Sequence, residues 1–409
     1  MNPLKKAFCR VYQLAFYAAM PFLPYREPET FQSIDDLVPL MKKLSVTSLL
    51  LVTDKGLRDA GLTTPLEAML KQSGITCTIY DGTRPNPTTE NVEEAVRMYR
   101  EHGCQAMIAF GGGSSMDCAK AVGARIAYPN RSLRQLGGNL RIFRKIPPLA
   151  AIPTTAGTGS EVTVTAVITD EKTSHKYAMN SFPLIPRYAV LDPDVTRTLP
   201  PSLTATTGMD ALTHAVEAYI GRSTTKETRR LALTAVGLVF RNIEKAYRDG
   251  NDRQARSNML RASYLAGQAF TKSYVGYIHA VAHSLGGQYN IPHGLANAVL
   301  LPIGLDIYGK TVYNKLHELG IAAGVTTSDV SHEKGAKDFI RAVRSLNRRM
   351  NIPETLSGIL AEDIPTMARH ADREANPLYP VPKLMDAREL EIFYYKAADW
   401  SESHDDTEY

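Results

Sequence analysis

The chain has 409 residues, of which 44% are hydrophobic and 22% charged, and its formal net charge is +5. This composition is typical of a globular protein with a large core, argues against a disordered chain, and at this length favours two domains. No block of lysine and arginine stands out, so the charge does not suggest nucleic acid. Four scattered cysteines without CxxC spacing favour free thiols and a cytoplasmic location.

Residues 1–30 form an N-terminal extension in which lysines precede an apolar stretch, a faint likeness to a secretory signal. Arg10 and Gln13 interrupt that stretch, no clean small-x-small cleavage site follows, and it is too short to span a bilayer. We therefore expect a helix or arm that packs on the body or on a partner subunit. Export and a targeting segment are the alternatives. No other segment suggests a membrane crossing.

The first half alternates strand-like and helix-like segments, which predicts parallel βαβ units and a Rossmann-like α/β domain over residues 31–197. The expected strands lie within residues 45–54, 74–82, 104–113, 147–159, 162–170 and 187–193. From about Pro200 the apolar residues follow helical periodicity instead. This predicts an all-α domain over residues 198–409, with an acidic tail that frays at its end.

A glycine loop follows one of these strands in AMIAFGGGSSMDCAKA, where bare backbone permits close approach to a phosphate and Ser114 is placed to cap the next helix. It lacks the GxGxxG pattern, so a tight turn without a ligand is the alternative. Asp54 ends an earlier strand, where a carboxylate accepts from a ribose 2′-hydroxyl and repels a 2′-phosphate. That favours NAD over NADP. A second loop, PTTAGTGSE, offers hydroxyl groups to the same cofactor.

The second half holds a group of candidate metal ligands. Asp210 and His214 stand at i and i+4, which places them on one face of a helix, although a simple helix-face hydrogen bond explains the pair equally well. His279 and His283 share the same spacing, and His293 follows two glycines and a proline that we expect to break the helix. One aspartate with several histidines suits Zn²⁺ or Fe²⁺. The ligands outnumber those that a tetrahedral site needs, so one histidine is available for chemistry.

These motifs together resemble the iron-containing (group III) alcohol dehydrogenase family. The matching pieces run in order from about residue 45 to 385: VTDK, PNPT, GGGSSMD, PTTAGTGSEVT, LDP, GMDALTHAVEAY, HAVAHSLGGQYNIPHGLANAVLLP and NPLYPVP. The resemblance implies the dehydroquinate synthase-like fold of that family, with a dinucleotide-binding α/β domain followed by a helical metal-binding domain. Departures at Lys272, Tyr274, Ala280 and Ser284 are expected to change the lining of the pocket.

The resemblance also implies roles for single residues. The metal ligands would be Asp210, His214, His279 and His293, and His283 would be a catalytic group that moves or orients a proton. The cofactor-binding residues would be Asp54, Asn86, Gly112, Gly113, Ser114, Thr154, Thr155, Thr158 and Lys176.

The implied reaction is metal-dependent, NAD-linked interconversion of a small primary alcohol and its aldehyde by hydride transfer, in a homodimer or a multiple of dimers. Glycerol dehydrogenase and dehydroquinate synthase, which share the architecture, are alternatives. A metal-dependent hydrolase and a non-catalytic scaffold are alternatives of other classes. The hydrolase needs neither glycine-rich loop, and the scaffold needs no set of metal ligands.

Overall fold

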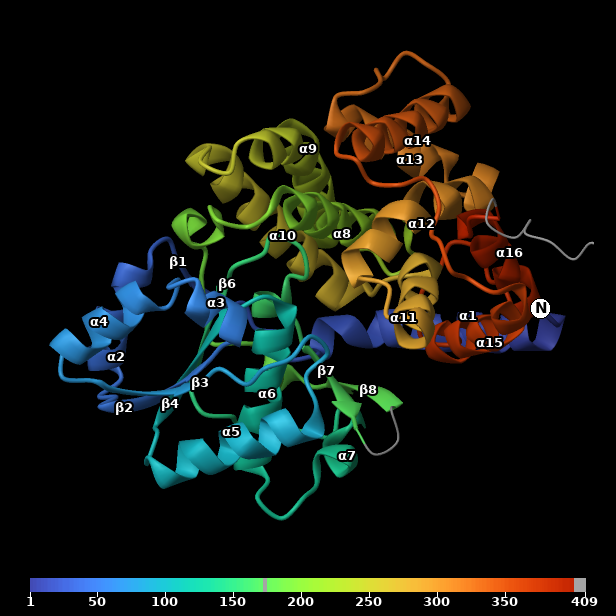
Figure 1. Cartoon of the computed structure of the whole chain (residues 1–409). Coiled ribbons are helices and arrows are strands. Elements are labelled where there is room, and N and C mark those ends of the chain that lie inside the picture. Colours follow the sequence, from blue (N-terminus) through green and yellow to red (C-terminus); the bar gives the residue numbers. More distant parts are fainter. Residues whose placement is uncertain (172–174, 401–409) are drawn as a thin grey trace, which may run out of the picture. The chain divides into compact units, whose positions relative to one another are not determined.

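The computed structural model describes residues 1–171 and 175–400, so the predicted fraying tail lies outside the described residues. The chain forms two compact units, each of which is described by itself. The sheet unit contains residues 24–199 and 250–271, and the helical unit contains residues 1–23, 200–249 and 272–409. Figure 1 labels their elements along the chain.

The sheet unit is built on a six-stranded parallel sheet with the order β1-β9-β6-β4-β2-β3. Its strands are β1 (Glu29–Phe31), β2 (Ser48–Val52), β3 (Thr76–Tyr80), β4 (Ala106–Gly111), β6 (Leu149–Pro153) and β9 (Tyr188–Val190). The helices between them are α2 (Leu37–Lys43), α3 (Lys55–Asp59), α4 (Thr64–Gln72), α5 (Thr89–Glu101), α6 (Gly113–Ala127) and α7 (Leu133–Leu136). The predicted parallel α/β fold is confirmed. The edge strand β1 is too short for its sequence to have indicated it.

Both faces of this sheet are buried, because consecutive residues of a strand point to opposite sides. Leu50 and Val52 of β2 pack in one apolar cluster with Met107, while Leu49 and Leu51 pack in the other. Because both faces are buried, the sequences of the strands are continuous apolar runs. Polar loops are therefore confined to the ends of the strands.

The segment 162–170, expected as one more strand of the parallel series, forms β7 (Thr165–Asp170) in a separate small sheet. It pairs antiparallel with β8 (His175–Asn180), which in turn pairs with the two-residue β5 (Gly138–Asn139). The antiparallel partner follows β7 directly in the chain, and a short connection favours this arrangement over a crossover.

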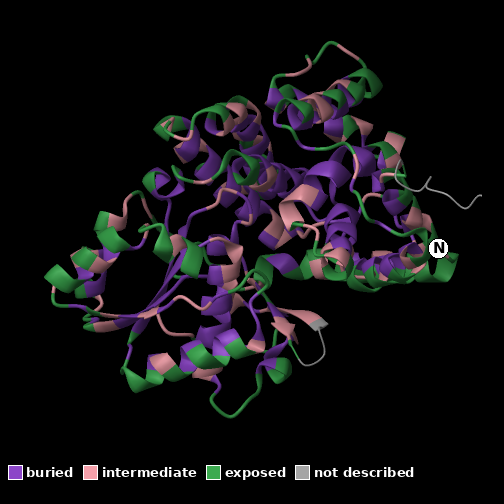
Figure 2. Ribbon diagram, viewed as in Figure 1, coloured by how far each residue is buried: buried purple, intermediate pink, exposed green. Residues whose placement is uncertain are grey.

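The helical unit contains α1 (Pro3–Ala19), α8 (Pro201–Ile220), α9 (Lys226–Arg248), α11 (Tyr277–Tyr289), α12 (His293–Tyr308), α13 (Tyr313–Ala323), α14 (His332–Arg349), α15 (Ile364–Ala375) and α16 (Ala387–Ala397). Helices α8 and α12 are buried over most of their length, as Figure 2 shows. Helix α10 (Arg253–Ser273) lies in the helical half of the sequence, yet its residues up to Thr271 belong to the sheet unit. Among the described residues, no helix combines the length and apolarity that a bilayer crossing requires.

Candidate metal centre and cofactor loops

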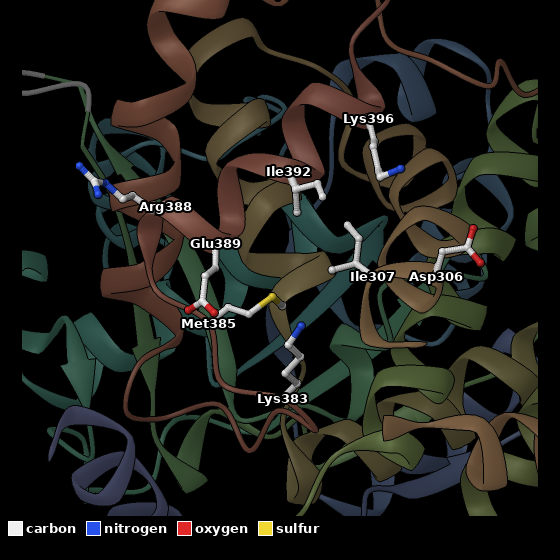
Figure 3. A pocket seen from close by; sticks show the side chains of 8 residues that line it. All are labelled: Asp306, Ile307, Lys383, Met385, Arg388, Glu389, Ile392 and Lys396. Atoms are coloured by element: carbon white, nitrogen blue, oxygen red, sulfur yellow. The ribbon is translucent and has the colours of Figure 1, made fainter. Parts of the chain in front are cut away.

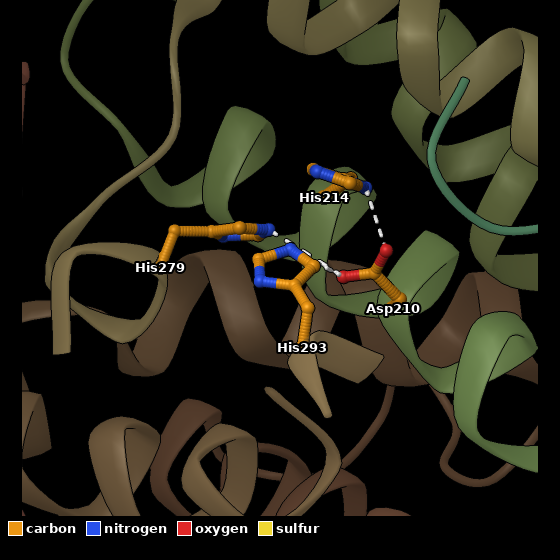
Figure 4. Close-up of side chains that lie close together, drawn as sticks. All are labelled: Asp210, His214, His279 and His293. Atoms are coloured by element: carbon orange, nitrogen blue, oxygen red, sulfur yellow. Dashed lines mark ion pairs between the residues drawn. The ribbon is translucent and has the colours of Figure 1, made fainter. Parts of the chain in front are cut away.

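Four side chains of the helical unit converge on one point in its interior (Figure 4). Asp210 and His214 come from α8, His279 from α11, and His293 is the first residue of α12. Each offers one ligand atom, and these atoms all lie within 4.8 Å of one another. This set is the one that the resemblance implied, and it excludes His283.

The carboxylate of Asp210 stands at the middle of the group. Its Oδ1 lies 3.4 Å from Nε2 of His293 and 3.7 Å from Nε2 of His279, while its Oδ2 lies 4.0 Å from Nδ1 of His214. The rings of His214 and His279 stack with centroids 4.3 Å apart. The pair at i and i+4 therefore shares one helix face as predicted, and the two histidines of the later helices complete the group.

Helix α12 can bring His293 to this point because glycine follows it. A Cβ on Gly294 would lie 2.6 Å from the backbone oxygen of Thr206 in α8, so a side chain here would push the two helices apart. The chain before His293 turns through Asn290, which has a left-handed φ of 55°, and Pro292 is the N-cap of α12.

The expected helix break between His283 and His293 is confirmed, but the part assigned to the two glycines is wrong, because α11 continues through Gly286 and Gly287 and ends at Tyr289. Glycine is only mildly unfavourable inside a helix, whereas the residue before a proline is pushed out of the helical region. The turn is therefore set by Asn290 and Pro292. It leaves only three residues between the two helices.

The charges of the group are strongly coupled. Burial alone would raise the pKa of Asp210, but the imidazoles of His214, His293 and His279 outweigh burial and hold that pKa well below its usual range. Burial alone would lower the pKa of His279, yet the nearby carboxylate of Asp210 and the hydrogen-bonded carboxylate of Glu217 raise it to about 9. Desolvation lowers the pKa of His293, whose side chain is the most exposed of the four at 39%. Near pH 7 the carboxylate of Asp210 is therefore charged, and the ring of His293 beside it is neutral.

Two further side chains hold the ligands from behind, and the sequence did not single them out. Glu217 Oε2 lies 2.6 Å from Nδ1 of His279, and Asn297 donates from Nδ2 to Oδ1 of Asp210 at 2.7 Å. Partners of this kind orient metal ligands and fix their tautomers. Helical spacing could have indicated these two residues, because Glu217 stands one turn after His214 and Asn297 stands one turn after His293.

The donor set fits a divalent transition metal. Nδ1 of His279 is held by Glu217, whereas the buried Nε2 makes no hydrogen bond to any described residue and faces Asp210. A buried ring nitrogen without a hydrogen bond is costly unless another group engages it. One carboxylate and three imidazoles are a ligand set that suits Fe²⁺ or Zn²⁺.

His283 lies beside this group. Its Nδ1 lies 2.7 Å from Oε1 of Glu374, and its ring stacks on that of His293 with centroids 5.1 Å apart. The side chain is 40% exposed. The carboxylate of Glu374 fixes one ring nitrogen, so the other nitrogen is the one available to another group.

In the sheet unit, the polar loops gather at the carboxyl ends of adjacent strands. Asp54 follows β2, the glycines follow β4, and the threonine loop follows β6, and these strands are neighbours in the order β6-β4-β2. Ligands of open parallel sheets bind at this edge. A Cβ on Gly112 would lie 3.6 Å from Thr155, and one on Gly113 would lie 2.9 Å from Thr158. The two predicted loops therefore face each other closely.

Several of the predicted cofactor residues already have local roles. Asp54 is the N-cap of α3, where its Oδ1 accepts from the backbone of Leu57 at 3.0 Å. The expected helix cap by Ser114 is wrong, because Gly112 is the N-cap of α6 and no side chain caps that helix. Asn86 has a left-handed φ of 58°. Lys176 lies on β8, and burial lowers its pKa. Thr154 is buried at the end of β6.

Comparison with known proteins gives the family. Residues 30–193 match "Iron-containing alcohol dehydrogenase" and residues 204–398 match "Fe-containing alcohol dehydrogenase family, C-terminal". The chain belongs to this family. It is 37% identical to alcohol dehydrogenase 4 of Saccharomyces cerevisiae (strain YJM789) over 347 residues, which cover 84% of this chain and 89% of the yeast protein.

Solved structures agree with this assignment. A crystal structure of 1,3-propanediol oxidoreductase superposes with a TM-score of 0.88 at 36% identity, covering 92% of this chain and 99% of the other. The sulfoacetaldehyde reductase of Bifidobacterium kashiwanohense, solved in complex with NAD⁺, superposes with a TM-score of 0.82 at 27% identity, covering 92% of this chain and 98% of the other.

As a member of the iron-containing alcohol dehydrogenase family, the chain is a metal-dependent, NAD-linked oxidoreductase that interconverts alcohols and aldehydes. The predicted family, fold class and reaction class are confirmed. The hydrolase and scaffold interpretations are set aside, since neither accounts for both family matches.

A surface depression of about 490 Å³ also lies in the helical unit of this dehydrogenase (Figure 3). It is lined by residues of α12 and α16 and of the chain before α16: Asp306, Ile307, Lys383, Met385, Arg388, Glu389, Ile392 and Lys396. It contains none of the predicted ligands or cofactor residues and mixes both signs of charge. We therefore assign it no part in the reaction.

Proposed function

We propose that Asp210, His214, His279 and His293 bind Fe²⁺, with Zn²⁺ as the second candidate, in an enzyme that interconverts a small primary alcohol and its aldehyde. The observation that carries this proposal is the convergence of four ligand atoms within 4.8 Å, all contributed by separate turns of packed helices. The family's description as iron-containing supports iron over zinc. When bound, the metal ion supplies Lewis acidity toward the alcohol or carbonyl oxygen.

The protein's own residues prepare that site. Asp210 supplies a negatively charged carboxylate, and Asn297 orients this carboxylate by its hydrogen bond to Oδ1. Glu217 holds Nδ1 of His279, which keeps Nε2 directed toward Asp210. The helical frame therefore fixes the ligands before any ion enters, and this lowers the entropy that binding would otherwise cost.

We assign His283 to proton transfer. Glu374 accepts from its Nδ1, a contact that orients the ring. Histidine suits this task because its ordinary pKa lies near neutral pH. The stacking of His283 on His293 keeps it beside the metal centre without making it a ligand.

For the cofactor, we propose that the loops at the carboxyl edge of the parallel sheet bind NAD. The residues are Asp54, Asn86, Gly112, Gly113, Ser114, Thr154, Thr155, Thr158 and Lys176. The close approach of Gly112 to Thr155 and of Gly113 to Thr158 supports a shared backbone cradle for the pyrophosphate. A carboxylate at Asp54 favours NAD over NADP, because a 2′-phosphate would meet like charge.

We also propose that residues 31–197 bind the cofactor and residues 198–409 bind the metal. We propose in addition that the chain assembles as a homodimer or a multiple of dimers and that it is cytoplasmic. The cysteines are free thiols, which supports a reducing compartment. The likeness to a 1,3-propanediol oxidoreductase supports short alcohols and diols as substrates.

The division of roles among the histidines gives the test. His279→Ala and His293→Ala should each lose most of the bound metal, whereas His283→Ala should keep metal near one per chain and lose turnover by about 10²-fold or more. Metal content by elemental analysis and NADH formation with a panel of C1 to C6 alcohols, under iron-loaded, zinc-loaded and metal-free conditions, are the measurements. Equal metal loss in all three variants would refute the assignment of His283. Full activity after removal of the metal would refute the proposed centre.

A further inference from the structure

The N-terminal helix α1 attaches to the helical unit by one side, which combines polar and apolar contacts. Gln13 is buried and donates to the backbone oxygens of Tyr379 and Pro377, and Arg10 donates to that of Val381 at 2.8 Å. Lys5 pairs with Asp372 at 2.9 Å. Cys9 and Met20 are buried on the same side of the chain.

The opposite face of α1 is exposed, as Figure 2 shows, and its side chains are apolar. Leu4, Phe8, Val11 and Leu14 of this face, and Phe22 after it, are 60 to 87% exposed. Large apolar side chains present on the order of 150–200 Å² each when free, so these five leave roughly 600 Å² in water. The largest apolar patch of a typical monomer measures about 300–600 Å². A surface this apolar on one helix indicates a docking face.

The spacing of this face specifies its partner. Leu4, Phe8, Val11, Ala15 and Ala18 follow one another in alternating steps of four and three, the seam of a coiled coil. The large side chains stand in the first half and the small ones in the second. Two such helices packed antiparallel can place Leu4 of one against Ala15 of the other and bring Phe8 and Val11 together between these pairs, and a two-fold axis makes the fit mutual.

We propose that α1 is an interface on which a second copy of this chain docks through its own α1, in antiparallel orientation with Leu4 beside Ala15 and Phe8 beside Val11. The buried area matches this occupant. Roughly 600 Å² from each copy, with Tyr12 and Tyr17 at the flanks, approaches the 800 Å² or so per partner of a standard interface. The face itself carries no charged residue, so the two copies meet no like-charge repulsion.

A lipid surface is the competing occupant, and the charges disfavour it. Membrane-bound helices use basic side chains beside the apolar face to contact anionic headgroups. Here Lys5 and Arg10 are both turned to the body, where they bind Asp372 and Val381. Only Lys6 is left to meet lipid.

The mass of the full chain in solution tests the proposal. We expect the double variant Phe8→Glu/Val11→Glu to have half the wild-type mass by sedimentation, with NADH formation unchanged because α1 holds none of the proposed site residues. If another interface also joins subunits, that interface persists in the double variant, and the mass of the assembly is still half that of the wild type. Phe143→Glu is the matched control, since this phenylalanine is 76% exposed and lies outside α1. An unchanged mass in the double variant would overturn the proposal.

Cross-linking tests the orientation. A mixture of Leu4→Cys and Ala15→Cys chains should form a disulfide-linked heterodimer under mild oxidation, at least tenfold above either variant alone. Linking in the Leu4→Cys variant alone would overturn the antiparallel arrangement. Sedimentation of the wild type with phosphatidylcholine–phosphatidylserine vesicles, lost in the double variant without any change of mass, would show that lipid occupies the face instead.

Discussion

Glu217→Gln is the substitution that most directly tests how the metal centre is held. The carboxylate accepts from four groups: the backbone nitrogens of Gly276 and Ile278, each at 2.9 Å, the backbone nitrogen of His279 at 3.4 Å, and its ring Nδ1 at 2.6 Å. It therefore caps the start of α11 and orients a ligand at once. Glutamine has nearly the same shape, but its NH₂ group cannot accept.

The expected loss follows from these contacts. Hydrogen bonds to a charged group contribute about 1.5–3 kcal/mol each. Oε2 accepts from three of the four groups and Oε1 from the backbone nitrogen of Ile278, so an amide forfeits at least one of these hydrogen bonds and weakens the others by removing the charge. We expect the metal-free protein to lose about 2–4 kcal/mol of unfolding free energy for this reason. Metal affinity should fall by about 10- to 100-fold, because the ring of His279 loses its charged partner.

Two assays separate these effects. Competition with a chelator of known affinity measures the metal, and urea unfolding of the metal-free protein measures stability. Glu374→Gln is the matched control, because it makes the same chemical change beside His283 and should retain the metal. A Glu217→Gln variant that binds metal as tightly as the wild type would refute the reasoning, as would equal metal loss in Glu374→Gln.

Three other substitutions probe the sheet unit. Lys120→Met removes a buried ammonium that donates to the hydroxyl of Ser160, to both oxygens of Thr163 and to the backbone oxygen of Thr165. Urea unfolding should show a loss of about 3–5 kcal/mol, and a loss below 1 kcal/mol would contradict this. Burial raises the pKa of Glu161 from 4.5 to about 7. The folded state then binds the extra proton, so stability falls as pH rises from about 4.5 to 7. Glu161→Gln should be more stable above pH 7, by up to about 3 kcal/mol, and should lack this slope in urea unfolding. Asp54→Ser keeps a helix cap but removes the charge, and the ratio of kcat/KM for NADP to that for NAD should rise at least about fivefold; an unchanged ratio would remove Asp54 from the ribose site.

Much of the fold follows from local patterns. Apolar runs followed by helical periodicity gave β2, β4 and β6 with their crossovers, and i, i+4 spacing placed Asp210 and His214 on one face of α8. Chain order does not fix which strand joins which sheet, so the antiparallel pairing of β7 with β8 was missed.

The supporting residues of the site were harder to foresee. Glu217 reads as one more polar residue of a buried helix until α11 is packed against it, because its partners lie about sixty positions later in the chain. The glycines of α11 led to a wrong prediction for a related reason. The free-energy penalty of glycine in a helix is small, and tertiary packing easily overrides a penalty of that size.

The contact between Glu217 and His279 also makes metal uptake a proton exchange. Without an ion, two carboxylates raise the pKa of His279 to about 9, so the ring carries a second proton at neutral pH. An incoming ion must expel that proton before Nε2 can serve as a ligand. Ion binding near neutrality then releases this proton, and the affinity for metal weakens as the pH falls. The carboxylate of Glu217, which holds His279 in place, thereby makes the enzyme's affinity for metal depend on the pH of its surroundings.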